Sequence, residues 1–174
     1  MSGSTSTAHG EAAASGGPTP ATTSVDVGRI RSILANVPDP EIPVLSVIDL
    51  GVIHAIDIDD RGITVGVLPT FLGCPAIELI LGAVRDALTP LGRPLDVHLT
   101  TAVPWTSERI TVEGRRALAA AGIAPPTDAP TLPPACPYCA SARTVMDNAF
   151  GPTRCRSLHY CRDCRQPFEA FRST

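Results

Sequence analysis

Two short segments, Cys136-Pro-Tyr-Cys139 and Cys161-Arg-Asp-Cys164, decide how the C-terminal part of this chain folds. Each is a C-x-x-C pair, and two such pairs at this separation place four thiolates around one tetrahedral ion. That is the geometry of a structural zinc ribbon, although tetrahedral sulfur sites suit iron as well as zinc. We therefore expect residues 132–174 to form a small β-ribbon held together by a metal.

Cys155 is a further cysteine of the same region, and its role stays open. It precedes Cys161 by six residues, so both side chains share one face of a straight strand. It fits a buried filler, a second reactive thiol, or a replacement for one of the four ligands. His159 has the same parity and is a rival ligand.

The hydrophobic pattern before the ribbon predicts a small α/β domain over residues 25–124. Apolar side chains recur at helical spacing in some segments and alternate with polar ones in others. The expected elements are a helix over 27–37, strands over 52–58 and 63–67, a helix over 75–91, a strand over 95–101 and a helix over 113–121. The fold class is thus α/β, a helix–strand–strand–helix–strand domain with helices packed on a three-stranded sheet, followed by a zinc β-ribbon.

The flanking segments are poor in bulky apolar residues. Residues 1–24 are mostly Ser, Thr, Gly, Ala and Pro, which predicts a disordered tail, and residues 125–131 form a Pro-rich linker. No apolar run approaches the ~20 residues of a membrane span, and no secretory signal pattern opens the chain. We expect a cytoplasmic protein with no membrane partner, whose cysteines are ligands and thiols rather than disulfides.

Charge is divided unevenly along the chain. The net charge is −3, yet residues 131–174 hold six Arg and three acidic residues, a balance of +3. A basic ribbon suits docking on an acidic partner. The clustered basic and aromatic side chains of a nucleic-acid reader are lacking, so we do not expect nucleic acid to be the partner.

Cys74 is the candidate reactive residue of the α/β domain. It lies in Thr70-Phe-Leu-Gly-Cys-Pro75, between a strand end and a helix start. The helix dipole and unpaired backbone N–H groups at such a position favour a thiolate. A thiolate there binds iron or zinc or acts as a nucleophile, whereas the structural alternative is a small buried apolar side chain.

Three acidic residues, Asp39, Glu41 and Asp49, lie in the loops before the first predicted strand. The Asp49-Leu-Gly51 segment brings a carboxylate to the same end of the sheet as Cys74. Alternatively, Asp39 and Asp49 form turns and Glu41 is solvated. No Ser–His–Asp order, phosphate-binding glycine loop or H-E-x-x-H motif is present, so a hydrolase, a nucleotide enzyme and a metalloprotease have no support.

The segments DPEIPVLSVIDLG (39–51) and LPTFLGCPA (68–76) together resemble the small iron–sulfur-assembly domain of SufT-like proteins. With the ribbon sequences CPYC (136–139) and FGPTRCRSLHYCRDCRQPFEAF (150–171) added, the chain resembles the PaaD family, which is encoded with phenylacetyl-CoA epoxidase. The resemblance runs over residues 25–172.

The resemblance implies a non-catalytic accessory or maturation factor of the epoxidase, a monooxygenase of aerobic phenylacetate degradation. The factor would assist assembly or insertion of the iron–sulfur cluster in the reductase subunit. Cys74 takes the place of the family's assembly cysteine and would carry a transient iron or iron–sulfur cluster. The zinc positions fall on Cys136, Cys139, Cys161 and Cys164, and Asp39, Glu41 and Asp49 align with segments whose roles are less defined.

Other functions stay open alongside maturation. One is a structural or regulatory subunit that contacts the oxygenase subunits and transfers no metal. Another is an electron carrier whose four ribbon cysteines hold one iron. Because one thiolate does not hold a cluster alone, the maturation hypothesis also predicts sharing between two protomers of a homodimer.

Overall fold

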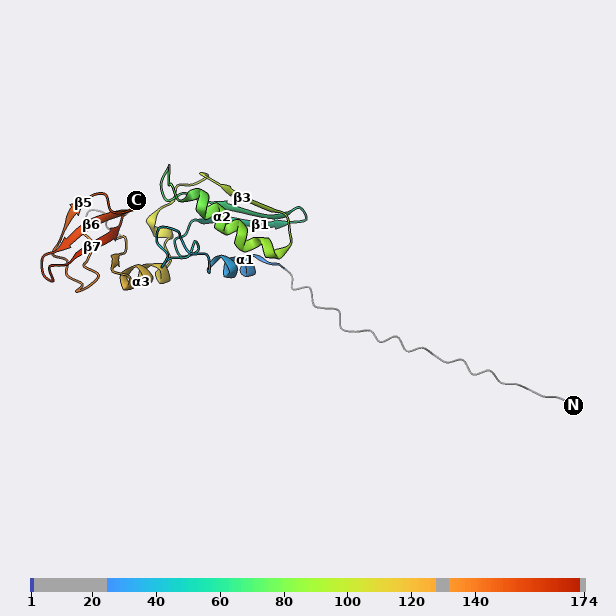
Figure 1. The fold of residues 1–174 in the computed structure, drawn as a ribbon, viewed down its shortest axis with the longest axis horizontal. Helices are drawn as coiled ribbons and strands as arrows, with labels where there is room; N and C mark the ends of the chain where they lie inside the picture. Colours follow the sequence, from blue (N-terminus) through green and yellow to red (C-terminus); the bar gives the residue numbers. More distant parts are fainter. Residues whose placement is uncertain (2–24, 128–131, 173–174) are drawn as a thin grey trace.

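The computed structural model describes Met1 and residues 25–127 and 132–172 (Figure 1). The predicted tail beyond Met1 and residues 128–131 of the predicted linker lie outside these ranges. The first sheet has three strands. Figure 1 shows this sheet with its helices, followed along the molecule by the sheet of the ribbon. No helix within the described ranges combines the length and apolar character needed to cross a membrane.

The first part of the chain has the predicted order of elements, so the α/β fold class is confirmed. Its elements are α1 (Val27–Leu34), β1 (Ile53–Asp59), β2 (Gly62–Val67), α2 (Ile77–Leu88), the 3-10 turn η1 (Thr89–Leu91), β3 (Leu95–Leu99), the 3-10 turn η2 (Ser107–Arg109) and α3 (Val112–Ala120). Strands β1 and β2 form an antiparallel hairpin, and β3 joins β2 in parallel after the α2 crossover.

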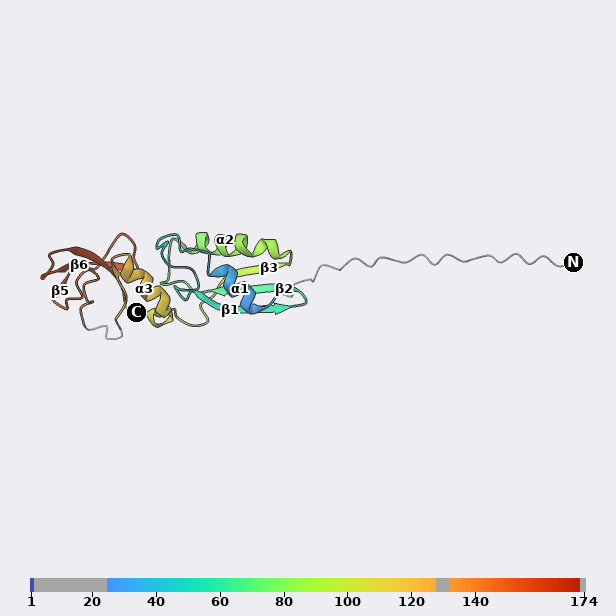
Figure 2. The ribbon, with the colours of Figure 1, turned by 90° about the horizontal axis from the view of Figure 1, so that it is seen from below.

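The core lies between this sheet and the two helices α1 and α2. Figure 2 shows α2 running along one side of the sheet. The paired residues Val65 and Val97 share the face that the helices cover, because cross-strand partners point to the same side. Ile30 of α1 and Val84 of α2 have no exposed surface in this core.

The second sheet has the strand order β4-β7-β6-β5. Its strands are β4 (Ile123–Ala124), β5 (Thr144–Asn148), β6 (Arg156–Cys161) and β7 (Pro167–Phe171). Strand β4 was not predicted: it follows α3 directly and pairs in parallel with β7. The first part of the chain therefore contributes a strand to the ribbon sheet, and the predicted division at residues 125–131 stays a prediction.

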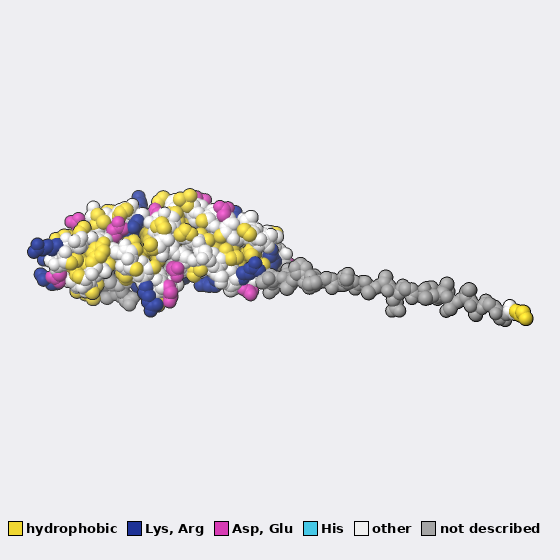
Figure 3. All heavy atoms as spheres, turned by 60° about the horizontal axis from the view of Figure 1, so that its bottom comes forward, with side chains coloured by type: hydrophobic (Ala, Val, Ile, Leu, Met, Phe, Trp, Pro, Cys, Tyr) yellow, Lys and Arg dark blue, Asp and Glu magenta, His cyan; other side chains and the backbone are white. Residues whose placement is uncertain are grey.

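Side chains also join the two sheets. Phe171, at the end of β7, is buried in the hydrophobic core of the first sheet. The Arg156 guanidinium, at the start of β6, donates a hydrogen bond to the Glu41 carbonyl (3.3 Å). Figure 3 shows a continuous surface across both parts, with acidic and basic side chains interspersed among apolar ones on the face in view.

Candidate metal centres

The four predicted ribbon cysteines, Cys136, Cys139, Cys161 and Cys164, come together in one cluster. Their sulfur atoms all lie within 4.8 Å of one another, and the Cys136–Cys164 and Cys139–Cys161 sulfurs are each 3.6 Å apart. Sulfurs bound tetrahedrally to zinc at about 2.3 Å would be about 3.8 Å apart. The four side chains therefore fit one tetrahedral ion.

Two equivalent turns hold these cysteines. The Ala140 N–H donates to the Cys136 carbonyl (2.8 Å), and the Arg165 N–H donates to the Cys161 carbonyl (3.0 Å). Ala140 and Arg165, each directly after the second cysteine of its pair, both have φ of 59°. The left-handed residue reverses the chain after each C-x-x-C pair, so the second sulfur faces the first.

Protonation differs sharply between two of the four thiols. The backbone N–H of Cys164 lowers the pKa of the Cys161 thiol to about 6, which favours its thiolate form. Burial raises the pKa of the Cys164 thiol to about 12. A cation that enters the cluster must displace the proton from Cys164.

Cys74 lies two residues before Ala76, the N-cap of α2, and only 7% of it is exposed. The backbone at the helix terminus favours the thiolate, as expected, but a stronger effect opposes it. Burial raises the pKa of the Cys74 thiol and outweighs the lowering by the Ala76 backbone N–H and the Thr70 hydroxyl. The charges of Glu41 and Asp39 raise it further.

Cys74 faces a small cavity of about 10 Å³. The lining residues are Asp39, Glu41, Ile42, Leu50, Thr70, Cys74, Ile80, Cys155 and Phe171. The predicted acids Asp39 and Glu41 are thus brought to Cys74. Cys155 and Phe171 belong to the ribbon, so the wall of this cavity is built from both parts of the chain.

Backbone hydrogen bonds hold one acid of the cavity, Asp39, in place. Asp39 is buried, and its Oδ1 accepts hydrogen bonds from the backbone N–H groups of Glu41 (2.9 Å) and Ile42 (2.7 Å), while Oδ2 accepts neither. Asp39 therefore both forms a turn and lines the cavity. Burial raises the pKa of both carboxyls, and the charge of Asp39 adds to the effect on Glu41.

Asp49 lies elsewhere and is not among the residues that line this cavity. Its carboxylate accepts hydrogen bonds from the hydroxyls of Ser46 (2.6 Å) and Thr111 (2.8 Å). Thr111 is the N-cap of α3. The geometry thus gives Asp49 a structural contact between the loop before β1 and the start of α3.

Cys155 is a thiol of the cavity that the sequence did not place there. It lies outside the four-sulfur cluster, directly before β6, with its sulfur 3.1 Å from the Thr153 hydroxyl. Burial raises the pKa of its thiol, and Glu41 and Asp39 raise it as they do for Cys74. Its strand parity with Cys161 gave no sign of this placement, because Cys155 precedes the strand.

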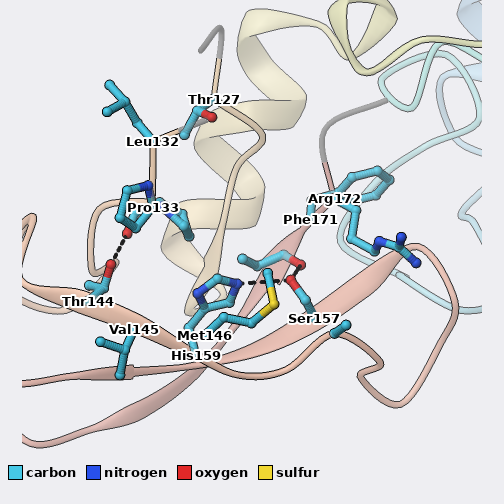
Figure 4. Close-up of a pocket in the computed structure, with 13 residues that line it drawn as sticks. Thr127, Leu132, Pro133, Thr144, Val145, Met146, Ser157, His159, Phe171 and Arg172 are labelled. Carbon is cyan, nitrogen blue, oxygen red and sulfur yellow. Dashed lines mark hydrogen bonds between the residues drawn. The ribbon is translucent and has the colours of Figure 1, made fainter. Parts of the chain in front are cut away.

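A larger cavity of about 460 Å³ opens on the ribbon (Figure 4). His159, the rival ligand, lies here, with Nε2 2.9 Å from the Ser157 hydroxyl. Figure 4 shows the two side chains pointing toward each other beside Met146. His159 Nδ1 is buried without a hydrogen-bond partner among the described residues, and burial lowers the pKa of the ring. His159 does not belong to the four-sulfur cluster.

Comparison with known proteins bears on both centres. Residues 28–98 match the family model "Iron-sulfur cluster assembly protein", and residues 124–172 match "PaaD zinc beta ribbon domain". The chain is 40% identical over 152 residues to a subunit of the "Putative 1,2-phenylacetyl-CoA epoxidase" of Escherichia coli (strain K12), covering 84% of this chain and 92% of that protein. This chain belongs to the PaaD family. The resemblance predicted from the sequence is confirmed.

Further relatives of this PaaD-family chain match its first part. It is 34% identical over 92 residues to "Fe-S protein maturation auxiliary factor YitW" of Bacillus subtilis (strain 168), covering 51% of this chain and 89% of that protein. A solved structure, the "Domain of Unknown Function DUF59 from Bacillus anthracis", is 24% identical with a TM-score of 0.49, covering 52% of this chain and 89% of that one. The sequence relatives support an accessory role in the epoxidase system or in iron–sulfur assembly.

Proposed function

We propose that this chain is a maturation factor that assists iron–sulfur cluster assembly or insertion in the reductase subunit of a phenylacetyl-CoA epoxidase. The observation that carries the proposal is the cavity at Cys74. A thiol lies there beside the carboxylates of Asp39 and Glu41, in the region that matches the iron–sulfur assembly family. Thiolate and carboxylate together are ligands for ferrous iron.

The protonation of the cavity suits temporary loading. The raised pKa of the Cys74 thiol keeps it protonated at neutral pH, and a protonated thiol is a poor nucleophile and resists oxidation. Iron, the cargo, would displace this proton on binding. Release to the recipient returns the proton to the sulfur, so loading and unloading need no change in the redox state of the protein.

Zinc in the ribbon has a structural role in this proposal. The four clustered sulfurs would hold it, and it would fix the strands that end at Cys161 and Phe171. Cys155 and Phe171 form part of the cavity wall, so the zinc-held ribbon shapes the site at Cys74. The ribbon is also the surface that we assign to docking on the reductase.

Reductase co-expressed with Cys74→Ala tests the proposal. We expect the iron and acid-labile sulfide content of the purified reductase to fall, because the cargo loses its sulfur ligand. Leu72→Ala is the matched control, since Leu72 is exposed in the same loop and lies outside the cavity lining. Full cluster occupancy with Cys74→Ala would reject the maturation role.

The second candidate is a structural or regulatory subunit of the epoxidase without metal transfer. The burial of Cys74, at 7% exposure, favours it, because a buried thiol also serves simply as core. This candidate predicts stable co-purification with the oxygenase subunits and unchanged reductase clusters in Cys74→Ala. The same co-expression experiment therefore separates the two.

A further inference from the structure

We propose that Cys155 is a second ligand for the cation carried at Cys74, so that the ribbon and the α/β part together form one dithiol site for a single thiophilic divalent ion. Only the identification of the natural ion as iron rests on the proposed function. The site itself is argued from the shared cavity, the burial of its groups and their charges.

The backbone fixes Cys155 at the cavity. Its carbonyl accepts a hydrogen bond from the Arg172 N–H (2.9 Å), which ties the residue to the end of β7. Its neighbour Arg156 pairs with Glu169 (2.5 Å) and also donates to the Glu41 carbonyl. The position of Cys155 is therefore set by contacts with both the ribbon and the Asp39–Glu41 loop.

The charges of the site call for a cation. The thiols of Cys74 and Cys155 are both influenced by the carboxylates of Asp39 and Glu41. Four groups that become anions around one cavity repel each other. The positive charge of Arg156 offsets part of this repulsion, because it lowers the pKa of Asp39, Glu41 and Cys155, and a divalent cation would offset more of it. Sulfur with carboxylate oxygen suits ions of the Fe²⁺, Co²⁺ and Zn²⁺ class rather than Mg²⁺ or Ca²⁺.

The size of the cavity selects a single ion. A free volume of about 10 Å³ holds roughly one water-sized particle, which excludes a preassembled cluster in this conformation. The ribbon sulfurs are the only set of three or more ligand atoms within 4.8 Å of one another in the described ranges. The groups at Cys74 form no such set in this structure, so in our proposal they would move closer together when the ion binds.

The binding step balances without an oxidant. The ion M²⁺ forms two metal–sulfur bonds, and the thiols of Cys74 and Cys155 release two protons to solvent. The metal and both sulfurs keep their oxidation states. Release of the ion reverses the step, and separation of the ribbon from the Asp39–Glu41 loop would remove one sulfur and weaken the hold on the cargo.

Cobalt titration of the full-length, zinc-loaded protein without oxygen tests the site. We expect one Co²⁺ per chain in addition to the retained zinc, with thiolate-to-cobalt charge-transfer absorption. Cys74→Ser and Cys155→Ser should each weaken Co²⁺ binding at least tenfold and reduce that absorption. Leu72→Ala is the matched control, because Leu72 is exposed, lies outside the cavity lining and leaves both sulfurs and their neighbours unchanged. Zinc content shows that each variant keeps its ribbon.

Two results would overturn the inference: wild-type protein that takes up no second metal ion, or Cys155→Ser that binds Co²⁺ as tightly as wild type. These outcomes are separate from the fate of the proposed function. If both thiols bind Co²⁺ but Cys74→Ala does not change the clusters of the reductase, the maturation role is refuted and the dithiol site is still supported. If Cys74→Ala lowers the cluster content of the reductase but Cys155→Ser does not change Co²⁺ binding, the maturation role is supported and the dithiol site is refuted.

Discussion

The indole ring of Trp105 lies against the ring of Phe171, with centroids 5.8 Å apart and planes tilted by 42°. Trp105 follows β3 in the first part of the chain, and Phe171 ends the last strand of the ribbon. Trp105 Nε1 also donates to the buried Leu50 carbonyl (3.0 Å), which fixes the ring. This aromatic contact joins the two sheets next to the cavity that Phe171 shares with Cys74.

Phe171→Ala should destabilise the protein by about 3–5 kcal/mol, because a buried aromatic side chain leaves a cavity behind. Urea unfolding followed by circular dichroism measures the loss. Phe150→Ala is the control: Phe150 is 65% exposed, and its ring contact with Arg172 is worth about 1 kcal/mol or less. Equal losses in the two variants would show that Phe171 does not hold the sheets together.

Gly51→Ala should cost at least about 2 kcal/mol, since left-handed backbone alone costs a side chain about 1–2 kcal/mol. Gly51 has φ of +71°, and a β-carbon there would lie 2.3 Å from the Arg109 carbonyl oxygen. Gly73 has φ of +85° with open space around it, so Gly73→Ala should show the backbone cost alone. Thermal unfolding of both variants measures the difference, and similar melting temperatures would contradict the predicted clash.

The sequence pattern predicted the elements of the first part because each carries its own periodic apolar face. Strand β4 could not be predicted in this way, because Ile123 and Ala124 are too short a run to show alternation and form a strand only by pairing with β7. The four ribbon cysteines were predictable because their pattern, unlike β4, is visible in a short stretch of sequence. The spacing within each C-x-x-C pair is local, and only the approach of the two pairs to each other depends on the fold.

The cavity at Cys74 was only half predictable. The sequence indicated Asp39 and Glu41, which lie in a compact loop whose turn chemistry is local. It did not indicate Cys155, because the contact depends on how the ribbon docks on the first sheet, and no periodicity encodes that. It indicated the effect of the helix terminus on the Cys74 thiol but not the stronger effect of burial, which raises the pKa and depends on packing around the residue.

Asp39→Asn should raise the melting temperature, and by more at pH 8 than at pH 5. Burial raises the pKa of Asp39 above its ordinary 3.8, so the folded state holds the proton more tightly than the unfolded state does. Stability from this group is present at low pH and falls as pH rises through the folded pKa. The amide of the variant has no charge to bury and keeps the Oδ1 acceptor. Scanning calorimetry at the two pH values measures the effect.

Asp60→Asn is the matched control for this pH dependence, because Asp60 is exposed in the β1–β2 turn. Its melting temperature should shift by the same small amount at both pH values. A gain for Asp39→Asn that is equal at pH 5 and pH 8 would contradict the assignment of a buried, hard-to-ionise carboxyl.

Removal of the ribbon metal should unfold residues 132–172 and change the environment of Trp105 at the same time. So small a module has little core of its own, and the metal supplies much of its folding energy. Trp105 is the only tryptophan of the chain, so the fluorescence comes from one ring whose surroundings include Phe171. A chelator titration should shift the emission to longer wavelength as protease cleavage appears within the ribbon, and added zinc should reverse both.

Phe171→Ala, which has already lost the contact, should show the cleavage with a much smaller emission shift. Emission and protease resistance that survive complete metal removal would show that strand pairing alone, including β4 with β7, maintains the ribbon.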